Sequence, residues 1–172
     1  SLRGNSERTP AEPYGFDERE KVALHNVVVT RVLTLCEIRH AVGDAFSLEH
    51  VYPTLLLAFE RCKELLALPG VYAVVFDNCA FGEKYRHRQI IITNQIWLAV
   101  LSRDCSRDHV HQTIGFDGEI RAETVSPYSR GLVQLWAEAF ARHVAAPDEE
   151  KCPFCAGREA ATWSLKAVVA TQ

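Results

Sequence analysis

Cysteine and histidine side chains carry the most specific chemical signal in this sequence. Cys152 and Cys155 are separated by two residues, a spacing that lets two thiolates occupy two corners of a tetrahedral metal site. Cys105, together with His109 or His111, is the obvious source of the remaining ligands. Four such ligands predict a closed, structural Zn²⁺ site that holds the C-terminal segment against the loop containing Cys105. The alternatives are a redox-active dithiol at Cys152 and Cys155, or thiols that bind no metal.

A short run of basic residues is the second candidate site. Lys84, Arg86 and Arg88 lie close together around Tyr85, and Arg107 follows farther along the chain. Such a cluster beside an aromatic ring is typical of a surface that binds the phosphates of RNA or DNA. The net charge of −3 gives no general attraction to nucleic acid, so any such contact must be local. The alternative is a solvated strand edge whose charges prevent aggregation.

The remaining chemical groups have simpler interpretations. Glu49, at the end of a strand candidate, is either the relic of a catalytic acid or a carboxylate that caps the next helix. Cys36 and Cys62 lie on apolar helical faces and are expected to be reduced core residues. Cys79 follows an apolar strand, where packing in the core or a loop is the expected role. Six cysteines are too few for a disulfide scaffold, so we expect a reducing, intracellular compartment; an organellar location after processing stays open.

Helical and strand patterns alternate along the chain, and they must position these groups. Leu24, Val28, Val32, Leu35 and Ile38 recur at helical spacing, and neighbouring apolar residues indicate that more than one face of this helix is covered. The expected helices span 17–42, 53–68, 94–101 and 126–144, and the expected strands span 45–51, 71–76, 88–93 and 112–116. The alternation predicts the α/β class, with a small, partly parallel sheet and helices against it.

The expected architecture is a partial Rossmann-like, three-layer sheet of three to four strands with a C-terminal segment stapled by Cys and His ligands. We divide the 172 residues into an irregular arm (1–17), an α/β half domain (18–146) and a Cys-x-x-Cys segment packed on it (147–172). A hydrophobic share of 48% and a charged share of 24% are those of a globular protein. No apolar stretch approaches the roughly 20 residues that span a bilayer.

From residue 46 to residue 94 the order of motifs resembles the DNA cytosine-5 methyltransferases, especially the phage-like and retroelement-encoded ones. Leu48–Val51 occupies the place of the family's Glu-Asn-Pro or Glu-Asn-Val sequence. Asp77–Gly82 matches Asp-x-Cys-x-(Phe/Tyr)-Gly, and Tyr85–Gln89 resembles Tyr-Arg-Lys-x-Thr. In retroelement versions a Cys/His stretch follows, which Cys105–His111 resembles, and then a helix start similar to that at 126–128.

The resemblance implies roles for some of these residues and leaves other parts of the family's site unmatched. In the family, the residue matching Glu49 contacts the cytosine ring, and arginines matching Arg86 and Arg88 hold the flipped base and the backbone. The nucleophilic thiolate and the S-adenosylmethionine pocket lie in earlier strands, whereas one helix and an arm precede Glu49 here. The resemblance therefore predicts only the C-terminal half of such a domain.

Three functional hypotheses follow. The first is a non-catalytic accessory or structural subunit of a larger assembly, with other protein subunits as partners. The second is half of a split nucleic-acid methyltransferase that another chain completes. The third is a zinc-stabilised module that binds RNA or DNA through its local basic patch.

Overall fold

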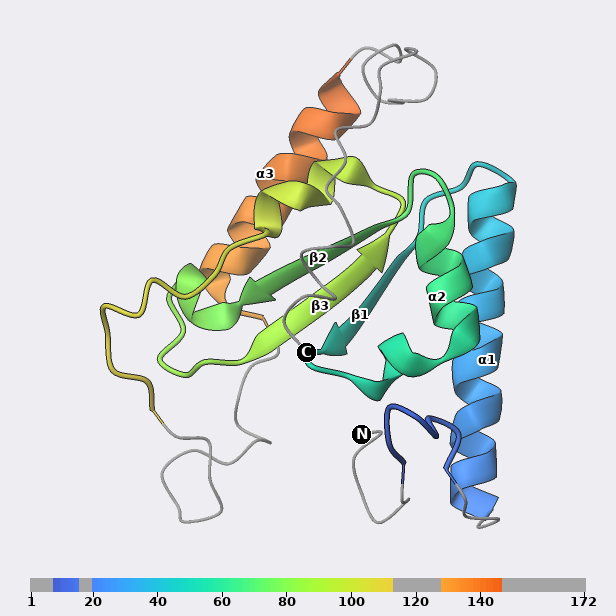
Figure 1. The fold of residues 1–172 in the computed structure, drawn as a ribbon. Coiled ribbons are helices and arrows are strands. Elements are labelled where there is room, and N and C mark those ends of the chain that lie inside the picture. The colour runs from blue at the N-terminus through green and yellow to red at the C-terminus, as the bar shows by residue number, and fades with distance from the viewer. Residues whose placement is uncertain (1–7, 16–19, 113–127, 147–172) are drawn as a thin grey trace.

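A sheet of three strands forms the middle layer of the structure, with helices on both faces (Figure 1). This computed structural model describes residues 8–15, 20–112 and 128–146. The strands are β1 (Ser47–Val51), β2 (Tyr72–Asp77) and β3 (Arg88–Thr93), and the α-helices are α1 (Glu20–Ala41), α2 (Glu60–Ala67) and α3 (Arg130–Ala145). Three short 3₁₀-helices, η1 (Leu55–Ala58), η2 (Asn78–Phe81) and η3 (Ile96–Leu101), connect them. The predicted mixed helix and strand class is confirmed.

The strands are ordered β1-β3-β2, and the central strand β3 is antiparallel to both neighbours. Leu48 lies opposite Ile92 on one side, and Val75 lies opposite Ile90 on the other. The prediction of a partly parallel sheet is therefore wrong for the described strands. β1 and β2 do run in the same direction, joined through α2, but η2 turns the chain back so that β3 inserts between them, as in a split β-α-β unit.

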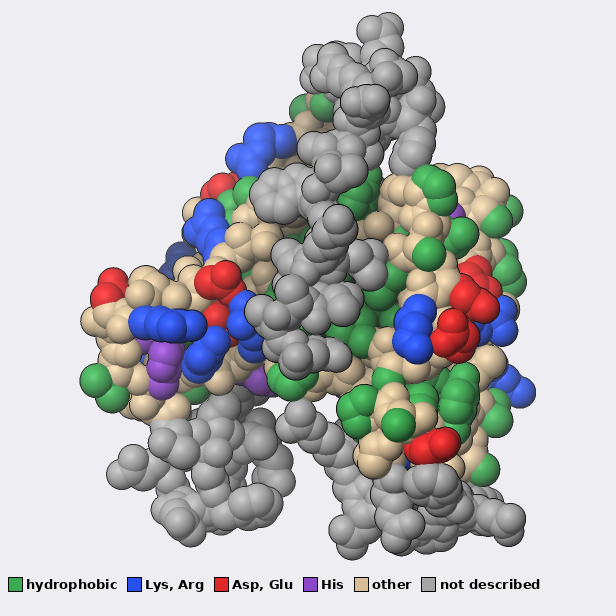
Figure 2. Space-filling view, viewed as in Figure 1, with side chains coloured by type: hydrophobic (Ala, Val, Ile, Leu, Met, Phe, Trp, Pro, Cys, Tyr) green, Lys and Arg blue, Asp and Glu red, His purple; other side chains and the backbone are tan. Residues whose placement is uncertain are grey.

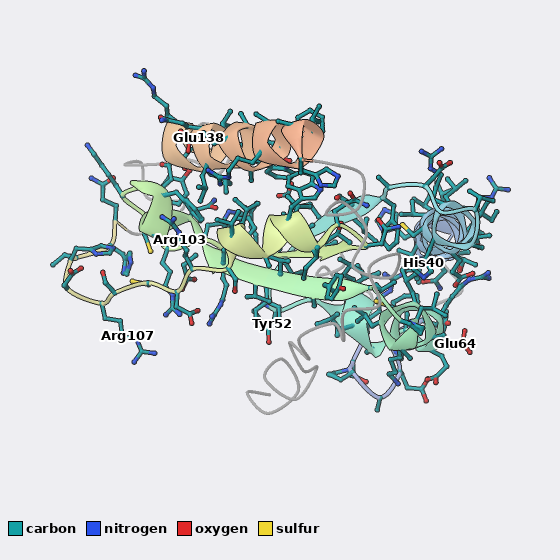
Figure 3. The ribbon with its side chains drawn as sticks, turned by 90° about the horizontal axis from the view of Figure 1, so that it is seen from above. His40, Tyr52, Glu64, Arg103, Arg107 and Glu138 are labelled. Atoms are coloured by element: carbon teal, nitrogen blue, oxygen red, sulfur yellow. The ribbon has the colours of Figure 1, made fainter. Side chains whose placement is uncertain are left out.

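The central position of β3 explains its continuous apolar sequence. Ile90, Ile91 and Ile92 have no exposed surface. Because successive side chains of a strand point to opposite faces, Ile90 and Ile92 pack toward α1 and α2, whereas Ile91 packs toward α3 and η3. The predicted buried strand is confirmed, and it divides the core into two clusters (Figure 3).

Several predicted elements differ in detail. The helix expected over 53–68 is interrupted at Phe59, whose extended backbone separates η1 from α2. The helix expected over 94–101 is the 3₁₀-helix η3. Ser129 is the N-cap of α3, and its hydroxyl accepts a hydrogen bond from the Leu132 N–H. Most of the strand expected over 112–116, and all of the segment 147–172, lie outside the described residues.

Helix α1 buries a different face from the one that its most regular spacing suggests. Val22, Leu33 and Cys36 are buried, whereas Leu24 and Leu35 are exposed by 59% and 61%. The expectation that more than one face is covered therefore does not hold within the described part of the chain.

Among the described helices, none is both long enough and apolar enough to cross a membrane.

Candidate metal centre

Four side chains gather at the end of the sheet where β2 enters η2. The thiols of Cys79 and Cys105 and the imidazoles of His109 and His111 each offer one ligand atom, and these atoms all lie within 4.8 Å of one another. Cys105 Sγ is 3.3 Å from His111 Nε2 and 3.9 Å from His109 Nε2. The structure thus brings the predicted ligands Cys105, His109 and His111 together. The group includes both histidines, whereas the sequence left open which of the two would be a ligand.

Among the described residues, the fourth member of the group is Cys79, and the predicted pair Cys152 and Cys155 is not tested. Those two cysteines lie outside the described residues. Cys79 was expected to serve packing alone, and it is indeed buried, but its thiol faces the other three groups. The available signal was its position directly after an apolar strand, at the sheet edge where polar side chains converge. Cys36 and Cys62 are confirmed as buried, unpaired thiols of the core.

Backbone geometry explains how residues distant in sequence meet. Cys79 lies in η2, which ends at Gly82 in a left-handed conformation with a φ of 95°. The other three ligands lie on the loop that follows η3 (Figure 1). Within this loop Arg107 has a φ of 63°, a value that is rare for residues other than glycine. The turn at Arg107 bends the chain so that the histidines return toward Cys105. The Arg107 N–H also points at Cys105 Sγ, at 3.3 Å.

A buried carboxylate anchors the same loop to the sheet. Asp77, the last residue of β2, has no exposed surface. Its Oδ2 accepts a hydrogen bond of 3.0 Å from the Cys105 N–H, and its Oδ1 accepts one of 3.3 Å from Arg86 Nε. Arg88 Nε lies 3.8 Å from the same Oδ1. Asp77 therefore holds Cys105 in place and has its own charge balanced by two arginines.

The charge of the Cys79 thiol depends on whether a cation is bound. Burial, with the neighbouring Cys105 thiol and the Asp77 carboxylate, raises the pKa of Cys79 to about 11. A bound divalent ion lowers the pKa of the Cys79 thiol again, because it binds and stabilises the thiolate. His109 Nδ1 lies 2.9 Å from Asp108 Oδ1, so the ring donates there and presents the lone pair of Nε2 toward Cys105. Carboxylate partners of this kind orient metal-bound imidazoles in many sites.

The predicted basic patch lies beside this cluster, where Figure 2 shows Lys, Arg and His side chains together. Arg86 and Arg88 direct their charge at Asp77, and Arg88 also pairs with Asp104. Lys84 is exposed, and Arg107 projects away from the body of the protein (Figure 3). Tyr85 is only 4% exposed, so its ring is not available to stack on a base.

Glu49 lies in the middle of the edge strand β1, opposite Ile91, and it does not cap the helix that follows. Its Oε1 accepts a hydrogen bond of 2.7 Å from Gln89 Nε2, and its Oε2 accepts one from the Tyr128 hydroxyl. The hydrogen bond to Glu49 raises the pKa of Tyr128 to about 12. The following helix η1 is capped instead by Thr54. Glu49 thus joins β1 and β3 to the segment leading into α3.

Comparison with protein-family models, with curated proteins and with solved structures finds no match for this chain. The resemblance to DNA cytosine-5 methyltransferases stays a prediction from the motifs. What the molecule can do must therefore be argued from the geometry of the four metal-ligand candidates, a group of side chains that could hold a metal ion.

Proposed function

We propose that this chain is a non-catalytic accessory protein whose sheet and loop are held together by a structural Zn²⁺ ion. The observation that carries the proposal is the convergence of Cys79, Cys105, His109 and His111 within 4.8 Å. Four protein ligands fill a tetrahedral site completely, and such closed sites stabilise folds, whereas catalytic zinc sites keep a position open for water or substrate.

The ligand types favour zinc among the common metals. Two thiols and two imidazoles form a mixed sulfur and nitrogen set, which suits the borderline-soft Zn²⁺ ion. Mg²⁺ and Ca²⁺ prefer oxygen ligands, and three carboxylates of this region already have partners: Asp77 bonds to Arg86 and the Cys105 N–H, Asp104 to Arg88, and Asp108 to His109.

A metal ion adds to the contacts that hold this loop, which include hydrogen bonds from the Cys105 N–H to Asp77 and from the Gln112 N–H to the Lys84 carbonyl. Residues 102–112 contain no helix or strand, and Cys105 is their one buried residue. A bond from Cys79 to this loop closes a long stretch of chain, so the binding energy of the ion becomes folding energy for the loop.

The contacts of Glu49 support the non-catalytic part of the proposal. A split methyltransferase would need this carboxylate free to meet a base, but both of its oxygens accept hydrogen bonds within the fold, from Gln89 and Tyr128. Calorimetry with S-adenosylmethionine tests this directly. We expect no binding, and a dissociation constant in the micromolar range for the purified chain would contradict the proposal.

A nucleic-acid-binding module is the second candidate, favoured by the exposure of Lys84 and Arg107 beside the metal centre. Binding through phosphates should weaken steeply with salt and should be lost in the double variant Lys84→Glu/Arg107→Glu. Affinity for a labelled single-stranded RNA that ignores both changes would remove this candidate.

Zinc content distinguishes the observed cluster from other arrangements. We expect about one equivalent of zinc per purified chain, lost in Cys79→Ser. Cys62→Ala, which removes a buried thiol outside the cluster, is the matched control and should keep its zinc. The double variant Cys152→Ser/Cys155→Ser should also keep it. Zinc retained in Cys79→Ser and lost in the double variant would refute the assignment of Cys79.

A further inference from the structure

A stripe of exposed apolar residues runs along α1 on the side opposite its buried face. Its members are each between 50% and 66% exposed: Leu24, Val28, Leu35, Ile38 and Val42. Val42 directly follows α1, and its N–H still bonds to the Ile38 carbonyl, so the helical path continues to it. In Figure 2 hydrophobic side chains are visible along the right-hand edge of the protein, where Figure 1 places α1.

The spacing of the stripe is that of a coiled-coil seam. Starting from Leu24, the positions follow one another at alternating steps of four and three residues, with Arg31 at the position between Val28 and Leu35. This alternation keeps side chains on one narrow band of a helix. Helix α1 has 22 residues, which is about three heptads and a length of about 33 Å. A surface helix needs one apolar face to pack against the core of its own protein. A second apolar face that runs along the whole helix indicates that another helix binds there.

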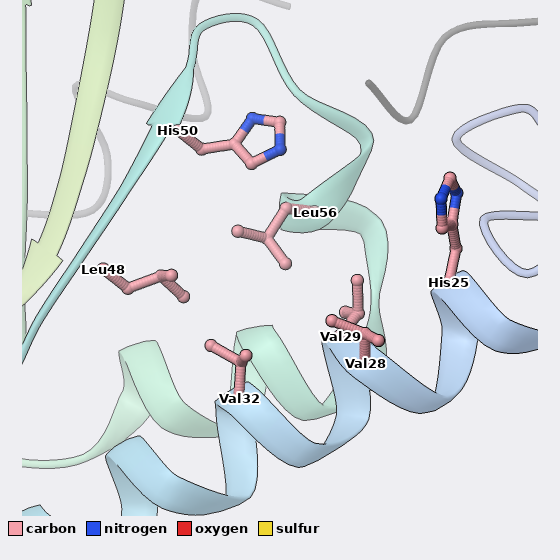
Figure 4. Close-up of a pocket in the computed structure, with 7 residues that line it drawn as sticks. All are labelled: His25, Val28, Val29, Val32, Leu48, His50 and Leu56. Atoms are coloured by element: carbon pink, nitrogen blue, oxygen red, sulfur yellow. The ribbon is translucent and has the colours of Figure 1, made fainter.

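A cavity of about 240 Å³ adjoins the stripe (Figure 4). It lies between α1, the edge strand β1 and η1, and its walls include Val28, Val32, Leu48, His50 and Leu56. Val28 belongs to both the stripe and the cavity wall. A helix seated on the stripe can therefore insert one large apolar side chain into a preformed pocket, the arrangement typical of an interface anchor.

Arg31 identifies the charge of the partner. It is exposed in the middle of the seam, and within the described part of the chain it forms no ion pair. A single polar residue at a seam position selects partners that can pair with it. We infer that α1 binds an amphipathic helix of another protein whose apolar seam is interrupted by one Asp or Glu opposite Arg31. This inference rests on the proposed accessory role, which it makes specific by stating the partner's chemistry.

A second copy of the chain fits the stripe less well. Parallel pairing places Arg31 against Arg31 of the other copy. Antiparallel pairing, with Leu24 opposite Val42, leaves the two Arg31 side chains one helical turn apart. Both arrangements bring like charges together in a partly desolvated seam, which is unfavourable. A carboxylate from a different chain removes the repulsion and adds an ion pair.

Synthetic peptides test the inference with the full chain. The probe is a fluorescently labelled helix of three heptads with Leu and Ile at the seam and Glu at the central seam position; its matched partner carries Lys there. By fluorescence anisotropy, we expect the Glu peptide to bind at least about tenfold more tightly than the Lys peptide. Arg31→Glu should reverse this preference. Leu35→Asp should abolish binding of both peptides, whereas Val133→Asp, on the exposed face of α3, should leave it unchanged.

The outcomes separate this inference from the proposed zinc centre. Circular dichroism and zinc content are measured on the same samples, so a folded, zinc-loaded chain that binds neither peptide overturns the inference alone. Equal binding of both peptides also overturns it. So does a chain that sediments as a dimer and dissociates on Leu35→Asp, because the occupant is then a second copy. Binding of the Glu peptide by a folded chain that lacks zinc supports the inference while overturning the metal assignment.

Discussion

Replacing Asp77 by alanine should destabilise the protein and weaken its metal site together. Asp77 is fully buried at the end of β2, and it accepts hydrogen bonds from the Cys105 N–H and from Arg86. Asp77→Ala leaves that N–H without its acceptor in a buried position. It also leaves Arg86 and Arg88 facing a gap where their counter-charge was.

The magnitude follows from the burial of each partner. Leaving a buried N–H unpaired costs about 1–3 kcal/mol. The side chains of Arg86 and Arg88 are 42% and 32% exposed, so water replaces much of the lost ion pairing, and each contributes at most about 0.5 kcal/mol. We therefore expect Asp77→Ala to lower the free energy of unfolding by about 1–4 kcal/mol. Because Asp77 positions a metal ligand, zinc affinity should also fall by about 10- to 100-fold.

Urea denaturation of zinc-loaded protein and competition with a zinc-binding dye measure the two effects. Asp104→Ala is the matched control: Asp104 also pairs with Arg88, but its side chain is 76% exposed, and the change should stay within about 0.5 kcal/mol. Asp77→Asn keeps the shape and one acceptor oxygen, so it should lie between the two. If Asp77→Ala and Asp104→Ala prove equally mild in both assays, the anchoring role of Asp77 is wrong.

Two further predictions concern close packing and pH. Gly131→Ala should destabilise the protein by about 1–2 kcal/mol although alanine favours helices, because the added Cβ would lie 2.5 Å from the Phe81 carbonyl oxygen. Val133→Ala, on the exposed face of the same helix, is the control and should have a much smaller effect. A Gly131→Ala protein that is more stable than the wild type would contradict the close approach. The Tyr128 pKa is raised from 10.0 to about 12, so the folded state holds this proton more tightly than the unfolded state, and the resulting stability is complete below pH 10 and is lost as the pH rises toward 12. Melting temperatures measured across this interval should fall more steeply for the wild type than for Tyr128→Phe or Glu49→Gln, and identical slopes would refute the hydrogen bond's role.

Local patterns in the sequence predicted most of the described elements and part of the site. The run Ile90–Ile92 predicted a strand buried on both faces, because an uninterrupted apolar strand has no side to turn to water. Cys105 with His109 or His111 was predicted as part of a metal site because these residues are close in sequence, although the other two ligands were expected to be Cys152 and Cys155. Glu49 shows the limit of this reasoning, because its partner Tyr128 lies 79 residues away, and no local pattern connects the two.

The sequence by itself predicted most of the described helices and strands, and it placed Cys105 and a following histidine in a metal site, because periodicity and short-range spacing depend on neighbours along the chain. The tertiary structure alone decided that β3 inserts antiparallel between β1 and β2. It also decided that the loop after η3 bonds to the end of β2, where Cys79 lies next to Cys105. It also decided which apolar face of α1 is buried: both faces satisfy the helical period, and the one with Leu33 meets the sheet while the one with Leu35 does not. The physical reason is that periodicity specifies a face, whereas burial requires another element to cover it.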